Sequence, residues 1–429
     1  MWHLLGTDRR FRRVFAGSSL STFGDTALYL TLPIWVKELT GSNSAAGLVF
    51  FALGLAALLE PLVGVVVDRM SRRRLLIGVN AAAIGVVASL FAVRGEDQVW
   101  LIYPVALLYG VTMSLVAGAR AGLLKDMLPA GQLADANAAL QTTGMGLRLI
   151  APLTGAALYA LWGPAWVILL DLGTFAAAIG FFAAVRVTES PVEASRTGGL
   201  RTEITAGFGF VRTHPVVRQM VLAAGLAFLG LGLFESVPFA LLESLGRAPS
   251  WFGALSTVQG VGVVAGGLLV ARLIRRLAEP RTLGTGLLLL AVATLLLLVP
   301  STAVVLAGAV LLGFSLPLVA VAAATALQRH TPARLLGRVF AANELVVGTA
   351  QVASVAAGAA LIAVVDFRVL LVAVVVVLLP VCALLLTRPA TAAGAAEQAG
   401  AGAAEQAGAG AAGEAGVAAQ PVPAGPDQG

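Results

Sequence analysis

Charged residues and cysteine are both scarce in this sequence. Asp, Glu, Lys and Arg together make up only 12% of its 429 residues, and hydrophobic residues make up 59%. A soluble domain carries about 25% charged residues, so this balance argues against an ordinary water-soluble protein. Cys382 is the only cysteine, which excludes an intrachain disulfide and a cysteine-cluster metal site.

Motifs for catalysis and nucleotide binding are absent as well. The histidines His3, His214 and His330 are dispersed along the chain and suggest no metal or catalytic site. No Gly-x-x-x-x-Gly-Lys motif is present to bind phosphates, and no serine stands in a nucleophile elbow. We therefore predict that the protein is not an enzyme, holds no cofactor or metal, and draws its energy from a proton gradient.

Long apolar runs fill most of the chain. A helix of about 20 apolar residues crosses a hydrocarbon core of ~30 Å, whereas the strands of membrane barrels need only about ten. We therefore predict an all-α membrane protein with twelve transmembrane helices. The predicted spans are 14–36, 44–67, 75–93, 99–119, 140–161, 165–185, 217–242, 252–274, 283–299, 303–326, 339–365 and 369–386.

Positive charge is concentrated on one side of these spans. Of the 28 Lys and Arg residues, only Lys37, Arg94, Arg247 and Arg368 follow odd-numbered spans, and Arg148 lies inside one. Because positive loops stay in the cytoplasm, we predict a multi-pass protein of the cytoplasmic membrane with both termini cytoplasmic. The net charge of +6 then marks topology and membrane lipid contact, and no nucleic-acid partner is expected.

A long polar connection divides the spans into two sets of six. We predict an N-terminal bundle over 1–186, a cytoplasmic central loop over 187–216, and a C-terminal bundle over 217–388. The remaining segment, 389–429, is rich in Ala and Gly and predicts a disordered cytoplasmic tail.

The second half echoes the first. Gly64, Arg69, Arg72 and Arg73 recur 203 residues later, and Pro33 recurs at nearly that offset as Pro238. The recurring residues are Gly267, Arg272, Arg275 and Arg276. Weak internal symmetry of this kind is typical of transporters that move two repeats around a central site.

The connection after the second span carries a known signature. It contains Gly64, the pair Asp68-Arg69, and then Arg72-Arg73-Arg74. This spacing resembles the loop motif of the major facilitator superfamily, although Ser71 stands where the family usually has Gly. The resemblance implies two pseudo-symmetric six-helix bundles and a monomer that moves small molecules by alternating access.

The same resemblance implies a cytoplasmic gate at this motif. Gly64 would let two helices approach closely, and Asp68 would lie near Arg120 or near the helix that starts around Arg338. The arginines Arg72, Arg73 and Arg74 have an alternative role as topology anchors that bind anionic lipid.

Short segments resemble the branch of macrolide-efflux and siderophore exporters, among them Gly24-Asp25 and Leu39-Thr40-Gly41-Ser42. In the fifth span, Pro152 and Gly155 are similar to an element that marks outward-working exchangers, although two of its glycines have become alanine. The resemblance therefore implies proton-coupled export of small amphiphilic molecules. Close packing at a proline bend is the alternative explanation of the element.

Asp25 is the leading candidate for proton coupling. It lies about halfway along the first span, where Ser18, Thr22, Asp25 and Tyr29 form one polar stripe that should face a cavity. A carboxyl group at membrane depth is costly unless it faces protein or water, so it is a functional candidate. The alternative is permanent pairing with a cation, for which Arg148 is available.

Other candidates come from the spans that line the cavity in the family. Glu235 would serve as a second carboxylate or contact a cationic substrate. Arg148, in the fifth span, would neutralise a carboxylate or bind an anionic substrate. Tyr109 and Met113 share a helix face suited to bulky, partly apolar ligands. Asp171 fits the role of a structural pair member at least as well as that of a site residue.

An importer of the same fold, or a membrane enzyme or sensor, remains an alternative function.

Overall fold

The chain folds into helices throughout the part that a computed structural model describes, residues 3–187, 200–332 and 335–387, and these residues contain no strand. Ten of the described helices are long and apolar enough to cross a membrane. The all-α fold is therefore confirmed. The predicted tail, 389–429, and part of the predicted central loop, 188–199, lie outside the described residues.

The first half contains eight α-helices and three short 3-10 helices. They are α1 (His3–Thr7), α2 (Arg9–Thr40), α3 (Asn43–Leu55), η1 (Ala56–Leu59), α4 (Glu60–Arg69), α5 (Arg72–Ala88), η2 (Ser89–Ala92), η3 (Glu96–Leu101), α6 (Ile102–Met127), α7 (Ala130–Trp162) and α8 (Pro164–Ala183). The second half contains α9 (Leu200–Thr213), α10 (Pro215–Glu235), α11 (Pro238–Ser244), α12 (Trp251–Leu296), α13 (Thr302–His330), α14 (Leu336–Leu361) and α15 (Phe367–Thr387).

The first predicted span is α2, which is more polar than the ten apolar helices. Its start is fixed by Asp8, whose side chain accepts hydrogen bonds from the backbone N–H of Arg10 and Phe11 at 2.7 and 3.1 Å. It ends at Gly41, where a φ of 65° lets the backbone N–H bond back to Lys37.

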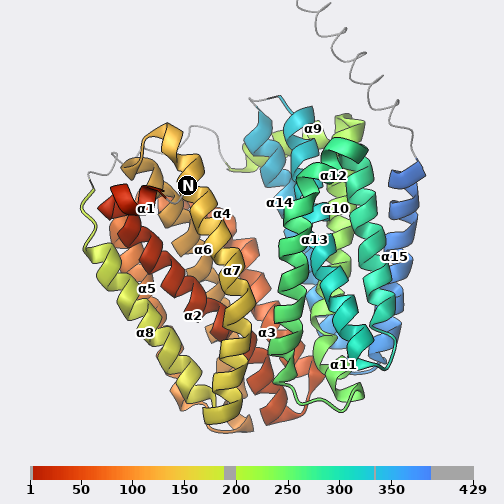
Figure 1. Cartoon of the computed structure of the whole chain (residues 1–429), viewed down its shortest axis with the longest axis horizontal. Helices are drawn as coiled ribbons and strands as arrows, with labels where there is room; N and C mark the ends of the chain where they lie inside the picture. Colours follow the sequence, from red (N-terminus) through yellow and green to blue (C-terminus); the bar gives the residue numbers. More distant parts are fainter. Residues whose placement is uncertain (1–2, 188–199, 333–334, 388–429) are drawn as a thin grey trace, which may run out of the picture.

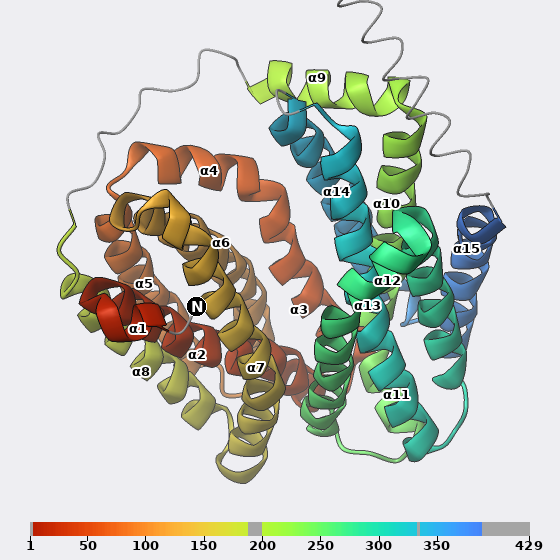
Figure 2. The same cartoon turned by 45° about the horizontal axis from the view of Figure 1, so that its top comes forward.

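The second predicted span is broken into α3, η1 and α4. The break ends at Glu60, and Pro61 follows in the first turn of α4, where its missing N–H costs no hydrogen bond. Beyond the break, α4 packs mainly against α6 and leans away from α14 (Figure 2). The continuous span predicted over 44–67 is therefore wrong at its centre.

One further predicted span differs from the structure. The span 217–242 ends as α10 at Glu235 and restarts as α11 at Pro238. The spans predicted over 252–274 and 283–299 are present as the two straight parts of α12, Trp251–Leu277 and Glu279–Leu296, which are joined at Ala278, where φ is 64° and ψ is 168°. The central connection over 187–216 contains the amphipathic helix α9, which packs against α14.

The two halves meet near one end of the molecule. Figure 1 shows α1 and α9 at one end, called the α1 face, and α11 at the other, called the α11 face. Contacts between halves join α3 to α14 and α7 to α12. Glycines permit this approach: a Cβ at Gly47 would lie 3.1 Å from Ala359 Cβ, and one at Gly253 would lie 2.8 Å from the Pro152 carbonyl oxygen.

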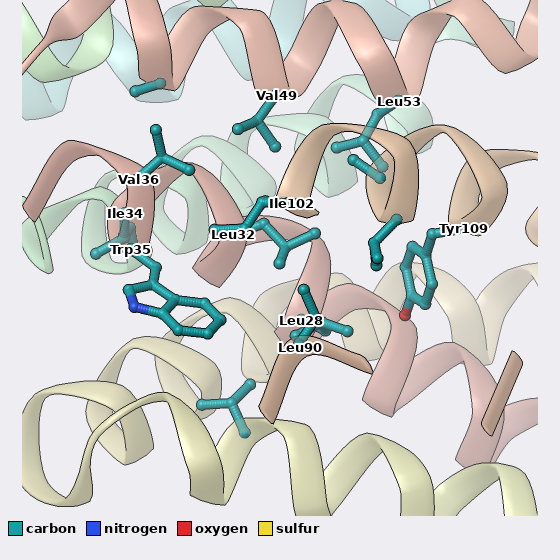
Figure 3. Close-up of a cluster of buried hydrophobic side chains, with 14 of the residues drawn as sticks. Leu28, Leu32, Ile34, Trp35, Val36, Val49, Leu53, Leu90, Ile102 and Tyr109 are labelled. Carbon is teal, nitrogen blue, oxygen red and sulfur yellow. The ribbon is translucent and has the colours of Figure 1, made fainter. Parts of the chain in front are cut away.

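The core of the first half is formed by α2, α3, α5, α6 and α8. Leu28, Leu32 and Leu53 lie within it, and Tyr109 lies at one end with its hydroxyl group pointing away from Leu53 (Figure 3). A polar tip at the edge of an apolar cluster needs a hydrogen-bond partner. That partner lies in the site described below.

Close helix packing in the second half yields a stability prediction. A Cβ at Gly262 of α12 would lie 2.8 Å from the Phe314 backbone nitrogen and closer still to the Val310 carbonyl oxygen, whereas one at Gly85 would meet nothing within 4 Å. Gly262→Ala should lower the free energy of unfolding by about 1–3 kcal/mol through overpacking. Gly85→Ala should raise it by about 0.5–1 kcal/mol by favouring helix. Thermal unfolding in detergent checks both, and equal shifts would contradict the packing.

Candidate functional site

Three polar side chains from three different helices meet inside the first half. The hydroxyl group of Tyr109 on α6 lies 3.0 Å from Asp25 Oδ1 on α2 and 3.1 Å from Asp171 Oδ2 on α8. All three are buried, with Asp25 9% exposed, Tyr109 1% and Asp171 not at all. We call them the Tyr109 triad.

The triad offers more acceptor oxygens than the single hydrogen of Tyr109 can serve. The Tyr109 hydroxyl group has a single hydrogen and can donate it to only one of the two carboxyl groups. The other carboxyl oxygen, about 3 Å away, makes a favourable contact only if that carboxyl group is protonated and donates to the hydroxyl oxygen. The geometry therefore fits one carboxylate, one carboxylic acid and one proton shared among three groups.

Neighbouring residues position the two carboxyl groups. Ser21, one turn before Asp25, donates to Asp25 Oδ2 at 3.2 Å. Thr174 donates to the backbone carbonyl oxygen of Asp171 at 2.8 Å, and its hydroxyl oxygen lies 3.4 Å from Asp171 Oδ1. A Cβ at Gly24 would lie 2.5 Å from Asp171 Oδ1 and nearer still to Thr174 Oγ1. Glycine at position 24 is therefore required for α2 and α8 to approach this closely.

The cation close to the triad is Arg120, not Arg148. The charge of Arg120, three turns after Tyr109 on α6, acts on Asp25. Arg148 is exposed on α7, and its charge acts on Tyr29 instead. No ion pair joins Asp25 to Arg148 among the described residues, so the alternative of a permanent pair between them gains no support.

The predicted cavity residues lie one helical turn from the triad. A pocket of about 210 Å³ is lined by Tyr29, Met113 and Glu60, among others. Tyr29 follows Asp25 by four residues, and Met113 follows Tyr109 by four, so both helices carry a triad residue and a pocket residue on one face. The polar stripe on α2 thus faces the bundle interior at Asp25 and the pocket at Tyr29.

Acidic side chains of the second half lie next to this pocket. The charge of Glu235 on α10 acts on Tyr29, and Glu235 accepts a hydrogen bond from Gln351 Nε2 on α14 at 3.3 Å. The charge of Glu344, also on α14, acts on Glu60. The pocket wall therefore combines an aromatic ring, a thioether and the Glu60 carboxyl group, and the charges of Glu235 and Glu344 act on it from the second half.

The predicted gate residues are apart in this conformation. A Cβ at Gly64 would meet no described atom within 4 Å, so the close helix approach expected there is absent. Arg73 donates to the carbonyl oxygens of Phe182 and Ala183 at 3.1 and 2.6 Å, and so caps the end of α8. Arg72 packs against the position of Gly122.

The other motif residues occupy varied positions. Arg69 and Arg338 are exposed, and the Arg338 carbonyl group packs against Gly207 of α9. The side chain of Asp68 lies outside what the structure describes. The charge of Arg120 acts on Asp25 of the Tyr109 triad.

Pro152 and Gly155 place α7 between two helices. A Cβ at Gly155 would lie 2.6 Å from the Ala27 carbonyl oxygen of α2, and the Pro152 carbonyl group faces Gly253 of α12. This element therefore joins the helix that carries Asp25 to the second half.

The α11 face is held closed by contacts between halves. Lys37 Nζ, at the end of α2, lies 3.1 Å from Glu243 Oε2, at the end of α11. The hydrogen bond and positive charge of Lys37 lower the pKa of Glu243 below its usual value. Sequence reasoning missed Glu243, although Lys37 and Glu243 follow the first and seventh spans, which are equivalent in the repeat.

An aromatic chain lies between this ion pair and the pocket. The ring centroids of Tyr29 and Phe50 are 6.1 Å apart, those of Phe50 and Phe252 are 6.0 Å apart, and those of Phe252 and Phe239 are 5.2 Å apart. Phe50 belongs to the first half, and Phe252 and Phe239 belong to the second. These aromatic rings therefore pack across the interface between the halves, on the side of the pocket that faces the ion pair.

Comparisons with known proteins agree with this architecture. The family described as Major Facilitator Superfamily matches residues 14–240 and 220–417. Macrolide efflux protein A of Streptococcus pyogenes is 23% identical over 271 residues, which is 61% of this chain and 66% of that protein, slightly under two thirds of its length. The match confirms the resemblance to the macrolide-efflux branch.

Two solved structures share the fold. A bacterial homologue of the iron transporter ferroportin, in an inward-facing state, has a TM-score of 0.68 at 18% identity, covering 89% of this chain and 99% of that one. The D323A mutant of the nucleoside transporter NupG has a TM-score of 0.72 at 10% identity, covering 88% and 99%.

The proton count of the triad can be tested by infrared spectroscopy. Purified protein at neutral pH should show the C=O absorption of a buried carboxylic acid. Asp25→Asn and Asp171→Asn should each remove that absorption, because Tyr109 can then satisfy the single remaining carboxylate. Asp97→Asn, which changes an exposed acid on η3, is the control and should leave it unchanged. An absorption that keeps its full intensity in both aspartate variants would show that the shared proton does not exist.

Proposed function

This chain belongs to the major facilitator superfamily of transporters, and we propose that it exports small amphiphilic molecules in exchange for protons. The Tyr109 triad is the observation that carries the proposal, because it is a buried site built to hold one proton one helical turn from a pocket. The macrolide-efflux relative supports export and a bulky, partly apolar substrate.

We propose that α2 and α6 couple the protonation of the Tyr109 triad to the shape of the pocket. Loss of the shared proton would leave two carboxylates facing one hydroxyl group in a buried site, which is unfavourable. Asp25 or Asp171 would then have to move away from Tyr109. Since Tyr29 and Met113 are one turn further along α2 and α6, such a shift changes the wall of the pocket.

Alternating access follows from the way the halves meet. The contacts at the α11 face close that side, while α4 and its Gly64 stand apart from α14 toward the α1 face. We propose that this is the cytoplasm-open state, with the arginine-rich α1 face and both termini in the cytoplasm. The chain would act as a monomer in which the bundles 1–186 and 217–388 move against each other.

Transport by everted vesicles tests the function. With an acid interior, vesicles containing the protein should accumulate a radiolabelled macrolide, because protons leave as substrate enters. Collapse of the gradient with a protonophore should abolish the accumulation. Asp25→Asn should reduce gradient-driven accumulation to background, and Asp97→Asn, an exposed acid at the α11 face, should not.

The direction of the response separates the alternatives. An importer would instead release preloaded macrolide from the same acid-interior vesicles. Accumulation that is equal with and without the gradient in the parent protein would overturn proton-coupled export.

The ion pair at the α11 face gives a second prediction, on conformation. Glu243→Gln removes the charge that Lys37 contacts and should raise the ratio of open to closed α11 face by up to about fivefold, because an exposed pair is worth only ~0–1 kcal/mol. Spin labels at Ser42 and Arg247 report this as a larger share of long distances.

Acid should have the same effect on the parent protein. The pKa of Glu243 is lowered by Lys37, so the pair persists from neutral pH downward and is lost only as pH falls through that lowered pKa. Glu243→Gln should not respond to acid in this range, and Glu96→Gln should behave like the parent. Unchanged distances in Glu243→Gln would exclude a gating role for the pair.

A further inference from the structure

A second cavity lies at the α1 face of the second half, remote from the Tyr109 triad. It has a volume of about 520 Å³ and is formed by α12, around its bend, and by the end of α13. Four arginines line it: Arg275, Arg276, Arg281 and Arg329. Glu279 is the one acidic residue among the lining residues.

Only one of these arginines has a partner among the described residues. Arg329 Nη1 lies 2.7 Å from Glu279 Oε1, and Glu279 is buried beneath it. The guanidinium groups of Arg275, Arg276 and Arg281 make no hydrogen bond or ion pair with any residue that the structure describes. The cavity therefore carries three uncompensated positive charges.

The backbone brings these charges together. Ala278 has a left-handed φ of 64°, and this single residue reverses the chain between the two straight parts of α12. As a result, Arg275 and Arg276 at the end of the first part face Arg281 in the first turn of the second part, Glu279–Leu296. The positive end of that second helix also points toward the cavity.

The internal repeat provides an independent comparison. Arg275 and Arg276 occupy the positions equivalent to Arg72 and Arg73, 203 residues earlier. In the first half, Arg73 binds the carbonyl oxygens at the end of α8 and Arg72 packs against the Gly122 position. The second copy keeps the same arginines without these internal partners.

Phosphoryl oxygens match this arrangement. A guanidinium group binds phosphate through two parallel hydrogen bonds. Three such groups around a cavity offer more hydrogen-bond donors than one carboxylate can accept. Apolar side chains are exposed on the same helix: Leu268, two turns before Arg275 on α12, is 78% exposed, and Leu269 is 40% exposed. A ligand with both a phosphoryl group and acyl chains fits charge and surface together.

We propose that this cavity binds the phosphoryl headgroup of an anionic phospholipid, with the acyl chains along α12 beside Leu268. Free phosphate would satisfy the arginines but would make no use of the apolar surface. The site is separate from the pocket at Tyr29, so lipid binding here is independent of the transport that we propose.

Native mass spectrometry of the full chain in detergent tests the site. The protein should retain phosphatidylglycerol more strongly than phosphatidylcholine. In Arg276→Ala/Arg281→Ala the affinity for phosphatidylglycerol should fall by about fivefold for each arginine removed. Arg368→Ala, an exposed arginine at the α11 face, should bind as the parent does.

A second variant and a competition experiment distinguish lipid binding from loss of folding and from binding of free phosphate. If the alanine variant does not fold, Arg276→Lys/Arg281→Lys keeps the charge and loses the paired hydrogen bonds, so it should bind more weakly than the parent. Inorganic phosphate is the competing probe. Phosphate that binds alone and displaces phosphatidylglycerol completely would identify a free-anion site and overturn the lipid assignment, as would equal binding of both lipids by the parent.

Discussion

The single hydroxyl hydrogen of Tyr109 is the constraint on which the first half depends. Two carboxyl groups face one phenol in a buried site, and burying both as anions would cost several kcal/mol without a cation or a proton between them. A proton shared among the three groups would lower that cost, and the two contacts of the Tyr109 hydroxyl group join α2, α6 and α8. Gly24 exists at the point where α2 and α8 touch because any side chain there would collide with Asp171.

The bilayer explains why most of the helices were predictable. Its thickness sets the length of an apolar run, so spans such as α13 and α15 follow from composition alone. The breaks inside the spans predicted over 44–67 and 217–242 were harder to foresee because they do not interrupt the apolar runs. Each of these two breaks is nevertheless followed within two residues by a proline, at Pro61 and Pro238, and this signal was available in the sequence.

The site was only partly predictable for a similar reason. The polar stripe on one helix identified Asp25, and helical spacing grouped Tyr109 with Met113. Neither pattern tells which remote helix faces them, so Asp171 was interpreted as a structural residue as readily as a functional one. The charge of Arg120, and not that of Arg148, acts on Asp25, because position along a helix gives depth in the membrane but leaves the helix face undetermined.

The internal repeat shows that the two halves differ at the positions of the Tyr109 triad. Counting 203 residues on from Asp25, Tyr109 and Asp171 leads to Phe228, Leu312 and Val374, which are all apolar. Leu312 and Val374 are buried in the core of the second half, and Phe228 packs against it. The fold thus accepts either a polar or an apolar set at the same three positions. At these positions the polar set occurs in the first half only, so the proton coupling that we propose would act on the packing between α2, α6 and α8 and would have no counterpart at the equivalent positions of the second half.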